Sequence, residues 1–340
     1  MFHDHKIILI TGACGFIGSA LTRRILNNES NIKKLVLIDS LTYAHDPNSY
    51  AEFINHPRVE FYKSDISSEN EIFEIVNKTC PTLIFNFAAE SHVDNSIDSP
   101  SEFMQTNISG TFSLLESIRK FNRANSQNIT FFHISTDEVY GDLADCDYEK
   151  FSECSPFKPS SPYSASKAAS DHLVQAWART YDLNTIITNC SNNYGPHQHS
   201  EKLIPKTILA CINRKEIPIY GLGNQIRDWL YVEDHIEALI DIVNTHDGCK
   251  NYCVGGNSPM TNLDVVHNIC DHFTSISSGD FDFRSLISFV SDRPGHDLKY
   301  SIDTSKIYNE IGWKPKHSFS QGISLTIKWF IDNHDKSKSI

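Results

Sequence analysis

The first half of the chain alternates short apolar runs with longer segments of helical periodicity, and no other feature limits the possible folds as strongly. Strands are expected at 6–11, 35–39, 59–63, 83–87, 129–135 and 184–189, with helices between them at 17–27, 69–78, 101–121 and 163–181. Such alternation is typical of a parallel sheet whose strands are joined by crossover helices. Because these crossovers are right-handed, we expect an α/β fold with a doubly wound parallel sheet of the Rossmann type.

The alternation ends near Cys190. Beyond it, short strands expected at 217–220, 227–231, 251–254 and 286–290 are mixed with helices expected at 204–213, 232–245, 263–273 and 323–333. Residues 1–190 are therefore predicted to form one domain, and residues 191–335 mainly a smaller, mixed α/β C-terminal domain that supplies half of a cleft. Some segments of the second part are expected to return to the first domain.

A glycine-rich turn follows the first predicted strand. Gly12, Gly15 and Gly18 are spaced G-x-x-G-x-x-G between this strand and a helix, with Phe16 and Ile17 inside the turn. Glycines allow backbone N–H groups to approach a pyrophosphate, and the start of a helix adds partial positive charge. The sequence therefore predicts a dinucleotide-binding site.

Asp39 ends the second predicted strand, about 20 residues after the glycine turn, where an acid can accept hydrogen bonds from an adenosine ribose. A 2′-phosphate about 4 Å away would meet a repulsion of order 4 kcal/mol per unit charge at an intermediate dielectric. Asp39 therefore favours NAD over NADP, although it can also be read as a plain turn residue. Asp65, before Ile66, could likewise meet the adenine or be an ordinary strand-end aspartate.

Charge and composition limit the possible partners. The formal net charge is −12 and no basic stretch compensates it, so we expect no nucleic acid partner. The apolar runs are too short to span a bilayer, and residues 1–5 lack the apolar core of a signal peptide. Nine cysteines without a C-x-x-C pair favour reduced thiols, and 16 histidines form no H-E-x-x-H motif. We expect a cytoplasmic protein without a metal site or a membrane association.

Tyr163 and Lys167 lie four residues apart at the start of a predicted helix and therefore share one face. An ammonium group beside a phenol stabilises the phenolate, and a shift of the tyrosine pKa from about 10 towards 7 requires roughly 4 kcal/mol. Tyr163 is predicted to be the base that deprotonates a hydroxyl while hydride leaves the same carbon. This spacing is common by chance, so the prediction depends on the nucleotide turn upstream.

Thr136, Asp137 and Glu138 directly follow the fifth predicted strand, where catalytic groups of open α/β sheets gather. Thr136 is expected to hydrogen-bond the oxygen of the oxidised carbon. Oxidation of an alcohol does not require these two carboxyl groups. If both face one substrate, their pKa values should differ, so that one stays protonated as an acid and the other is ionised as a base. Both can face inward only from a turn, because neighbours in a strand point to opposite faces. A solvated loop is the alternative.

Together with further motifs, these residues resemble the dTDP-glucose 4,6-dehydratase family of extended short-chain dehydrogenases/reductases. The likeness covers nearly the whole chain, from about Lys6 to Phe330. It is carried by TGACGFIG at 11–18, AAESHVD at 88–94, STDEVYG at 135–141, YSASK at 163–167, SNNYGP at 191–196 and RDWLY at 227–231.

The resemblance implies a lyase that uses NAD to convert dTDP-glucose or UDP-glucose into the 4-keto-6-deoxy sugar, in rhamnose-type deoxysugar biosynthesis. It implies that Tyr163 and NAD oxidise C4, that Glu138 removes the C5 proton, that Asp137 protonates the departing C6 hydroxyl, and that hydride returns to C6. The C4 ketone makes this possible because it spreads the charge formed at C5 into an enolate.

The resemblance also implies which residues bind the two ligands. For NAD these are Gly12, Gly15, Phe16, Ile17, Gly18, Asp39, Thr42, Asp65, Ile66, Ala88, Ala89, Thr106, Tyr163, Lys167 and Asn193. For the nucleotide sugar they are Ser91, Thr136, Asn192, Lys202, Lys206, Pro218, Tyr220, Arg227, Asn262, Arg293 and His296. Arg227 and Arg293 suit a pyrophosphate because guanidinium groups make bidentate contacts, although either could be a surface ion pair.

Two further expectations follow from the resemblance. Family members often have more glycine in the segment that here reads LTYAHDPN at 41–48, so the loop near the adenosine is expected to have a shape of its own. A homodimer is expected through the helices at 101–121 and 163–181.

Three alternatives share part of this pattern. A nucleotide-sugar 4-epimerase would need Thr136, Tyr163 and Lys167 but no paired acids, and a nucleotide-sugar decarboxylase would need no acid aimed at a C6 hydroxyl. A non-catalytic NAD-binding protein would need no Tyr163 and Lys167 pair. The presence of Asp137 and Glu138 therefore favours a dehydratase over these alternatives. Thymine and uracil differ by one methyl, worth ~1–3 kcal/mol in a pocket, so the choice of nucleotide stays open.

Overall fold

The computed structural model describes residue 2 and residues 5–145, 149–245, 250–277 and 280–334. Its centre is a seven-stranded sheet with the order β10-β6-β5-β4-β1-β2-β3, in which every neighbouring pair is parallel. Its strands are β1 (Ile7–Thr11), β2 (Lys34–Asp39), β3 (Val59–Lys63), β4 (Leu83–Asn86), β5 (Thr130–Thr136), β6 (Thr185–Cys190) and β10 (Lys250–Val254). The expected doubly wound Rossmann-type sheet is confirmed.

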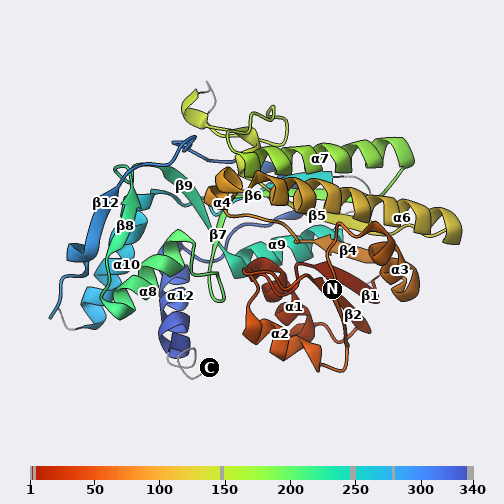
Figure 1. Cartoon of the computed structure of the whole chain (residues 1–340), viewed down its shortest axis with the longest axis horizontal. Coiled ribbons are helices and arrows are strands. Elements are labelled where there is room, and N and C mark those ends of the chain that lie inside the picture. The colour runs from red at the N-terminus through yellow and green to blue at the C-terminus, as the bar shows by residue number, and fades with distance from the viewer. Residues whose placement is uncertain (1, 3–4, 146–148, 246–249, 278–279, 335–340) are drawn as a thin grey trace.

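Helices cover both faces of this sheet (Figure 1). One face packs against α1 (Phe16–Asn28), α2 (Pro47–Ile54), α9 (Val232–Thr245) and α11 (Ser305–Ile311), and the other against α3 (Glu69–Thr79), α6 (Thr111–Asn125) and α7 (Pro162–Tyr181). Alternate strand residues serve the two cores: Ile8 and Ile10 enter the first, and Leu9 enters the second. Both faces are buried, which explains why these strands read as continuous apolar runs rather than as alternating ones.

The cap, as we call the second unit, lies beside the carboxyl ends of the strands and has a hydrophobic core of its own. Its sheets are β11-β9-β7 and β12-β8, built from β7 (Asn192–Tyr194), β8 (Ile217–Tyr220), β9 (Ile226–Tyr231), β11 (Pro259–Thr261) and β12 (Ile287–Val290). Its helices are α8 (Leu203–Asn213), α10 (Asn262–Ile276) and α12 (Phe319–His334). Figure 1 shows β8, β12, α8, α10 and α12 gathered on one side of the molecule.

Two elements expected in the cap belong to the first unit instead. β10 pairs in parallel with β6 at the edge of the sheet, and α9 packs in the core shared with α1. The chain thus leaves the first unit after β6, returns to it with α9 and β10, and returns again with α11, whose Ile307 packs in the same core. Periodicity predicts that a buried strand exists at 251–254, but it does not say which sheet that strand joins.

Local structure differs from the prediction in two places near the site. The expected loop at 41–48 contains the start of α2, where the Asp46 side chain accepts a hydrogen bond from the backbone N–H of Asn48 and Pro47 occupies the first turn. The helix expected at 101–121 consists of α5 (Pro100–Phe103), a π-helical turn at Met104–Gly110, and α6. In the residues described, no helix combines the length and apolar character needed to cross a bilayer.

Candidate active site

The turn between β1 and α1 brings backbone segments so close that side chains do not fit between them. Gly12 has a φ of +62°, and a Cβ there would lie 2.7 Å from the backbone nitrogen of Ala88. A Cβ on Gly18 would lie 2.2 Å from the carbonyl oxygen of Gly12. The N–H groups at the start of α1, which begins after its N-cap Gly15, therefore remain accessible to a pyrophosphate.

Asp39 is buried at the end of β2 and organises this turn. Its Oδ2 accepts a hydrogen bond from the N–H of Cys14, and its Oδ1 accepts one from the N–H of Leu41, each at 2.8 Å. Burial raises the pKa of Asp39, and the two backbone donors lower it. Each carboxylate oxygen has a further lone pair, so Asp39 can hold the turn and still accept from a ribose hydroxyl.

A pocket of about 120 Å³ opens beside Asp39. Besides Gly12 and Gly15, its lining includes seven of the residues predicted for the cofactor, namely Asp39, Thr42, Asp65, Ile66, Ala88, Ala89 and Thr106. Thr106 lies in the π-helical turn, a feature often found at functional sites. The same turn carries Asn107, whose Oδ1 accepts from the N–H of Glu90 at 2.9 Å and whose Nδ2 donates to the carbonyl of Glu90 at 3.0 Å.

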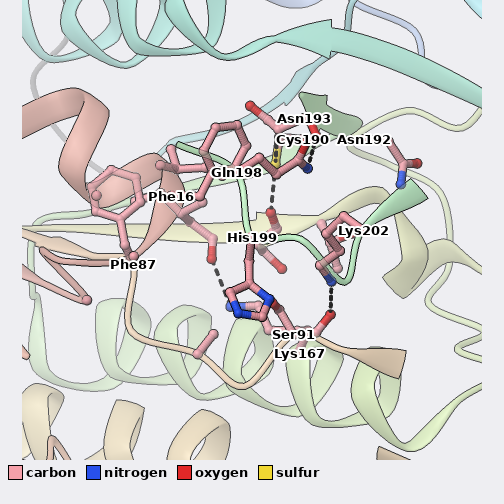
Figure 2. Close-up of a pocket in the computed structure, with 18 of the residues that line it drawn as sticks. Phe16, Phe87, Ser91, Lys167, Cys190, Asn192, Asn193, Gln198, His199 and Lys202 are labelled. Carbon is pink, nitrogen blue, oxygen red and sulfur yellow. Dashed lines mark hydrogen bonds between the residues drawn. The ribbon is translucent and has the colours of Figure 1, made fainter. Parts of the chain in front are cut away.

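A second pocket, of about 270 Å³, continues the first. The two share part of their lining, and the residues in common are Gly12, Gly15, Ala44, Phe87 and Ala89. Together they form one groove with an acid at one end and the glycine turn in the middle, which fits a dinucleotide. The end away from Asp39 is lined by Thr136, Asp137, Glu138, Tyr163 and Lys167. Figure 2 shows residues that line this second pocket.

The two acids face this pocket because the chain turns sharply where β5 ends. Asp137–Tyr140 form a 3-10 turn directly after Thr136, whose Oγ1 accepts from the N–H of Glu138 at 3.3 Å. Asp137 and Glu138 both line the pocket, which neighbouring residues of a regular strand could not do. The turn ends at Gly141, whose φ is +87°.

The environments of the two acids differ. Asp137 Oδ2 is buried and accepts no hydrogen bond from the described residues, and burial followed by the charge of Glu138 raises the pKa of Asp137 well above its usual value. Burial also raises the pKa of Glu138, but Arg227, Arg293 and Lys202 lower it. Asp137 is thus suited to carry a proton, and Glu138 ionises more readily.

Tyr163 lies in the first turn of α7, where Ser161 and Ser164 form a capping box, and 8% of the tyrosine is exposed. Burial raises the pKa of Tyr163 well above its usual value; the charge of Glu138 adds to this and a hydrogen bond with Thr136 opposes it. The expectation that Lys167 stabilises the phenolate stays a prediction. Lys167 lies one helical turn deeper, and its Nζ donates to the carbonyl oxygen of Ile134 at 2.8 Å.

Asp171 is a site residue that the sequence analysis missed. It is fully buried one turn beyond Lys167, and its Oδ2 accepts from Ser135 Oγ at 2.9 Å and from Asn189 Nδ2 at 3.0 Å. Burial lowers the pKa of Lys167, and Asp171 raises it, so the acid helps to keep the buried ammonium charged. The available signal was spacing, because Tyr163, Lys167 and Asp171 recur every four residues on one helical face.

Four of the predicted binding residues reach the pocket from the segments around β4, β7 and α8. These are Ser91, Asn192, Asn193 and Lys202. Lys202 Nζ donates to the carbonyl oxygen of Ser91 at 2.8 Å, which links the cap to the large unit across the cleft (Figure 2). Asn193 is held by His235, whose Nδ1 lies 2.9 Å from Asn193 Oδ1.

Arg227, Arg293 and His296 lie together next to the pocket, and the two arginines carry the positive charge of this group. Both arginines lower the pKa of His296, which burial lowers most. Arg227 is 5% exposed, and its guanidinium donates to the carbonyl oxygens of Ile226 and Asp297, each at 2.8 Å. Together with Lys202, the two arginines gather positive charge beside Glu138, as a diphosphate requires.

The remaining predicted substrate residues lie outside the two pockets described. Lys206 is exposed on α8, and Pro218 and Tyr220 lie on β8. Asn262 begins α10, and its Nδ2 donates to Gln225 Oε1 at 3.5 Å. None of these four residues lines either pocket, and their part in binding the nucleotide stays a prediction.

The loop after β7 contributes pocket residues that the sequence did not indicate. Gln198, His199 and Glu201 line the larger pocket, as does Cys190 at the end of β6. Gln198 Nε2 donates to the carbonyl oxygen of Asn193 at 2.8 Å, whereas Gln198 Oε1 is buried without a partner among the described residues. This loop has no periodicity, so its only signal was its position directly after the SNNYGP motif.

The described residues contain no disulfide and no cluster that could hold a metal ion. The seven cysteines that lie within the described residues are free. Cys146 and Cys249 fall outside those residues. Within the same part of the chain, no three His, Cys, Asp or Glu side chains are arranged to hold a metal ion.

Residues 9–326 match the family described as GDP-mannose 4,6 dehydratase. Among curated proteins, the chain is 48% identical over 338 residues to a dTDP-glucose 4,6-dehydratase of Haemophilus influenzae, with 97% of this chain and 99% of that protein covered. It is 49% identical over 337 residues to a dTDP-glucose 4,6-dehydratase of Salmonella typhimurium, with 96% of this chain and 93% of that protein covered.

Solved structures of dTDP-glucose 4,6-dehydratases are also similar to this chain. DesIV, a dTDP-glucose 4,6-dehydratase from Streptomyces venezuelae crystallised with NAD, superposes with a TM-score of 0.88 at 36% identity, with 97% of this chain and 98% of that chain covered. A UDP-glucose 4-epimerase from Thermotoga maritima superposes with a TM-score of 0.84 at 24% identity, with 96% of this chain and 99% of that chain covered, which shows a shared fold.

Proposed function

This chain is a member of the dTDP-glucose 4,6-dehydratase family, and from that membership and the site geometry we infer that it is an NAD-dependent hydro-lyase that converts dTDP-glucose into dTDP-4-keto-6-deoxyglucose. One observation carries the choice of reaction within this fold. Asp137 and Glu138 line the same pocket as Thr136 and Tyr163, on a turn that presents both acids. An epimerase or a decarboxylase has no use for this second acid.

When bound in the groove, NAD supplies a hydride acceptor for C4 and a hydride donor for C6. The glycine turn and Asp39 hold it, because the close backbone approaches at Gly12 and Gly18 leave the helix N-terminus free for the pyrophosphate. Tyr163 takes the proton of the C4 hydroxyl. Thr136, which hydrogen-bonds with Tyr163, holds the same oxygen.

Elimination of water is assigned to the two acids. Glu138 takes the C5 proton, and the electron pair of that C–H bond forms the C5–C6 double bond while the C6–O bond breaks. Asp137 delivers its proton to the departing hydroxyl, so water leaves. Asp137 suits this step because its buried, unpartnered Oδ2 is poorly solvated as an anion and its pKa is raised well above the usual value.

The nucleotide is proposed to bind through its diphosphate to Arg227 and Arg293, the two guanidinium groups beside Glu138. The proposal of thymidine as the nucleoside rests on the relatives, because thymine and uracil differ by one methyl group, worth ~1–3 kcal/mol. Steady-state rates with dTDP-glucose and UDP-glucose, measured side by side with identification of the product, test both points. We expect dTDP-4-keto-6-deoxyglucose and a higher kcat/KM with dTDP-glucose. A 4-epimer as the product would contradict the proposed function.

We also propose a homodimer through α6 and α7, which lie side by side on the outside of the sheet (Figure 1). This flank exposes large apolar side chains: Phe112 and Tyr181 are 38% and 45% exposed, and Trp177 lies between them with ring centroids 5.8 and 5.5 Å away. Neighbouring exposed apolar side chains mark contact surfaces. Light scattering should give a dimer for the wild type and a monomer for Phe112→Glu, and an unchanged mass for that variant would contradict the interface.

The cytoplasm is the proposed site of action. The two small molecules in the reaction, NAD and a nucleotide sugar, support this location, and the free thiols of the seven described cysteines fit a reducing compartment. Fractionation of source cells with an antibody against the chain tests the proposal.

A further inference from the structure

Asp94 joins the large unit to the cap at the edge of the substrate cleft. It lies in α4 (Val93–Asp98), the short helix that follows β4. Its Oδ1 accepts from Arg293 NH1 at 3.1 Å, and its Oδ2 accepts from the hydroxyl of Tyr220 at 3.1 Å. Arg293 and Tyr220 both belong to the cap, so a single carboxylate holds two cap side chains.

The hydrogen bond with Asp94 uses one end of the Arg293 guanidinium and leaves another donor unused. Arg293 Nε is buried and donates to no acceptor in the described part of the chain. Arg293 also lowers the pKa of Glu138, so the charge of Arg293 acts on a residue of the catalytic pocket. A buried N–H without an acceptor is costly, and a bidentate contact with a phosphate would satisfy it.

The backbone that carries Arg293 is fixed separately. Asp292 Oδ1 accepts from the N–H of Arg293 at 2.8 Å and lies 2.6 Å from His296 Nδ1. Asp292 Oδ2 accepts from Gln225 Nε2 at 2.9 Å, which ties this turn to the segment before β9. Asp292 therefore places the start of the side chain, and Asp94 places its charged end.

The ion pair between Asp94 and Arg293 contributes little to the stability of the fold. The exposed fractions of the two side chains are 32% and 21%, and pairs that remain in contact with solvent are worth little. The geometric effect is larger, because an arginine side chain has many rotamers and loses them when it binds. Holding the guanidinium in advance removes part of that cost at the moment of binding.

We propose that Asp94 is a positioning residue for substrate: it holds Arg293 across the cleft so that the free edge of the guanidinium meets the diphosphate of the nucleotide sugar. This rests on the proposed function, because that function supplies the diphosphate. Asp94 itself lines neither of the two pockets described above. Tyr220, the second group on Asp94, has a supporting role in the same contact.

Calorimetric titration of the NAD-loaded protein with dTDP and with thymidine tests this role. For Asp94→Ala we expect about tenfold weaker binding of dTDP and unchanged binding of thymidine, which has no phosphate. KM for dTDP-glucose should rise by about the same factor while kcat changes little. Asp94→Asn, which preserves the shape, should fall between the wild type and Asp94→Ala. Asp98→Asn, which removes an exposed carboxylate from the same helix, is the matched control and should change nothing.

A double variant shows whether the effect passes through Arg293. If Asp94 acts by holding Arg293, then Asp94→Ala combined with Arg293→Ala binds dTDP no more weakly than Arg293→Ala alone. Additive losses in the double variant would overturn the proposal. Unchanged binding of dTDP by Asp94→Ala would also overturn it. Tighter binding would overturn it too, because it would mean that Asp94 competes with the phosphate. These outcomes rest on binding alone, so they stay separate from the proposed function, which fails only if the wild type makes no 4-keto-6-deoxy sugar.

Discussion

The charge of Glu138 raises the pKa of Tyr163, so the two groups that accept protons in the proposed cycle oppose each other. A phenolate at Tyr163 forms more easily while Glu138 is neutral. Burial assists this, because it raises the pKa of Glu138. Oxidation of C4 needs the tyrosinate, so the charge of Glu138 works against this step.

Glu138→Gln removes this opposing charge. We expect the pKa of Tyr163 to fall, so that oxidation of C4 reaches its maximal rate at a pH about one unit lower than in the wild type, while formation of the keto-deoxy sugar slows by about 10²–10⁴. The absorbance of reduced nicotinamide in a single turnover, followed as a function of pH, measures the first effect. A pH profile unchanged or moved to higher pH would show that Glu138 does not act on Tyr163.

Asp137→Asn retains the shape of the side chain but cannot donate the acidic proton. Oxidation of C4 should continue, elimination should slow by about 10²–10⁴, and reduced nicotinamide should accumulate as a result. Rapid mixing with dTDP-glucose and analysis of the quenched sugar separate the two steps. Elimination at the wild-type rate would exclude Asp137 as the acid.

Asp39 is expected to control the choice of cofactor. Asp39→Asn replaces a carboxylate, which accepts hydrogen bonds from two backbone N–H groups, with a neutral amide. NAD binding should therefore weaken by about tenfold or more. The penalty against NADP should shrink, because the repulsion of a 2′-phosphate is lost. Fluorescence titration with both cofactors measures the ratio of affinities, and an unchanged ratio would remove Asp39 from this role.

His235 should make the fold less stable in mild acid. Burial lowers its pKa to about 3, so between about pH 6.5 and about pH 3 the unfolded chain binds a proton that the folded chain does not. The free energy of unfolding therefore decreases as the pH is lowered. This residue alone lowers it by about 2 kcal/mol between pH 7 and pH 5. Urea unfolding of the wild type and His235→Gln at these two pH values measures it. Equal pH dependence in both proteins would count against the prediction.

The large sheet was predictable because its signals are local. Each buried strand is an apolar run, and the glycine turn after Thr11 and the acid at Asp39 appear at fixed positions relative to those strands. The destination of β10 was not predictable in the same way, because a run such as Tyr252–Val254 packs equally well in either sheet. Only pairing with β6, about 60 residues earlier in the chain, decides it.

The identity of the candidate catalytic residues was likewise predictable, but the contacts and charges that surround each of them were not. Spacing places Tyr163 and Lys167 on one face of α7, yet it does not show that Lys167 reaches the carbonyl of Ile134. Asp94 shows the same limit more strongly. Its partners Tyr220 and Arg293 are more than 100 residues away in sequence, and nothing in the motif around Asp94 points to them.

Transfer of a hydrogen label tests the central claim most directly. In dTDP-glucose that carries deuterium at C4, the proposed cycle removes that hydrogen from C4 and returns it to C6 after water has left. The account predicts a 4-keto-6-deoxy product with the deuterium at C6. A product that keeps the deuterium at C4, as epimerisation would give, would contradict it.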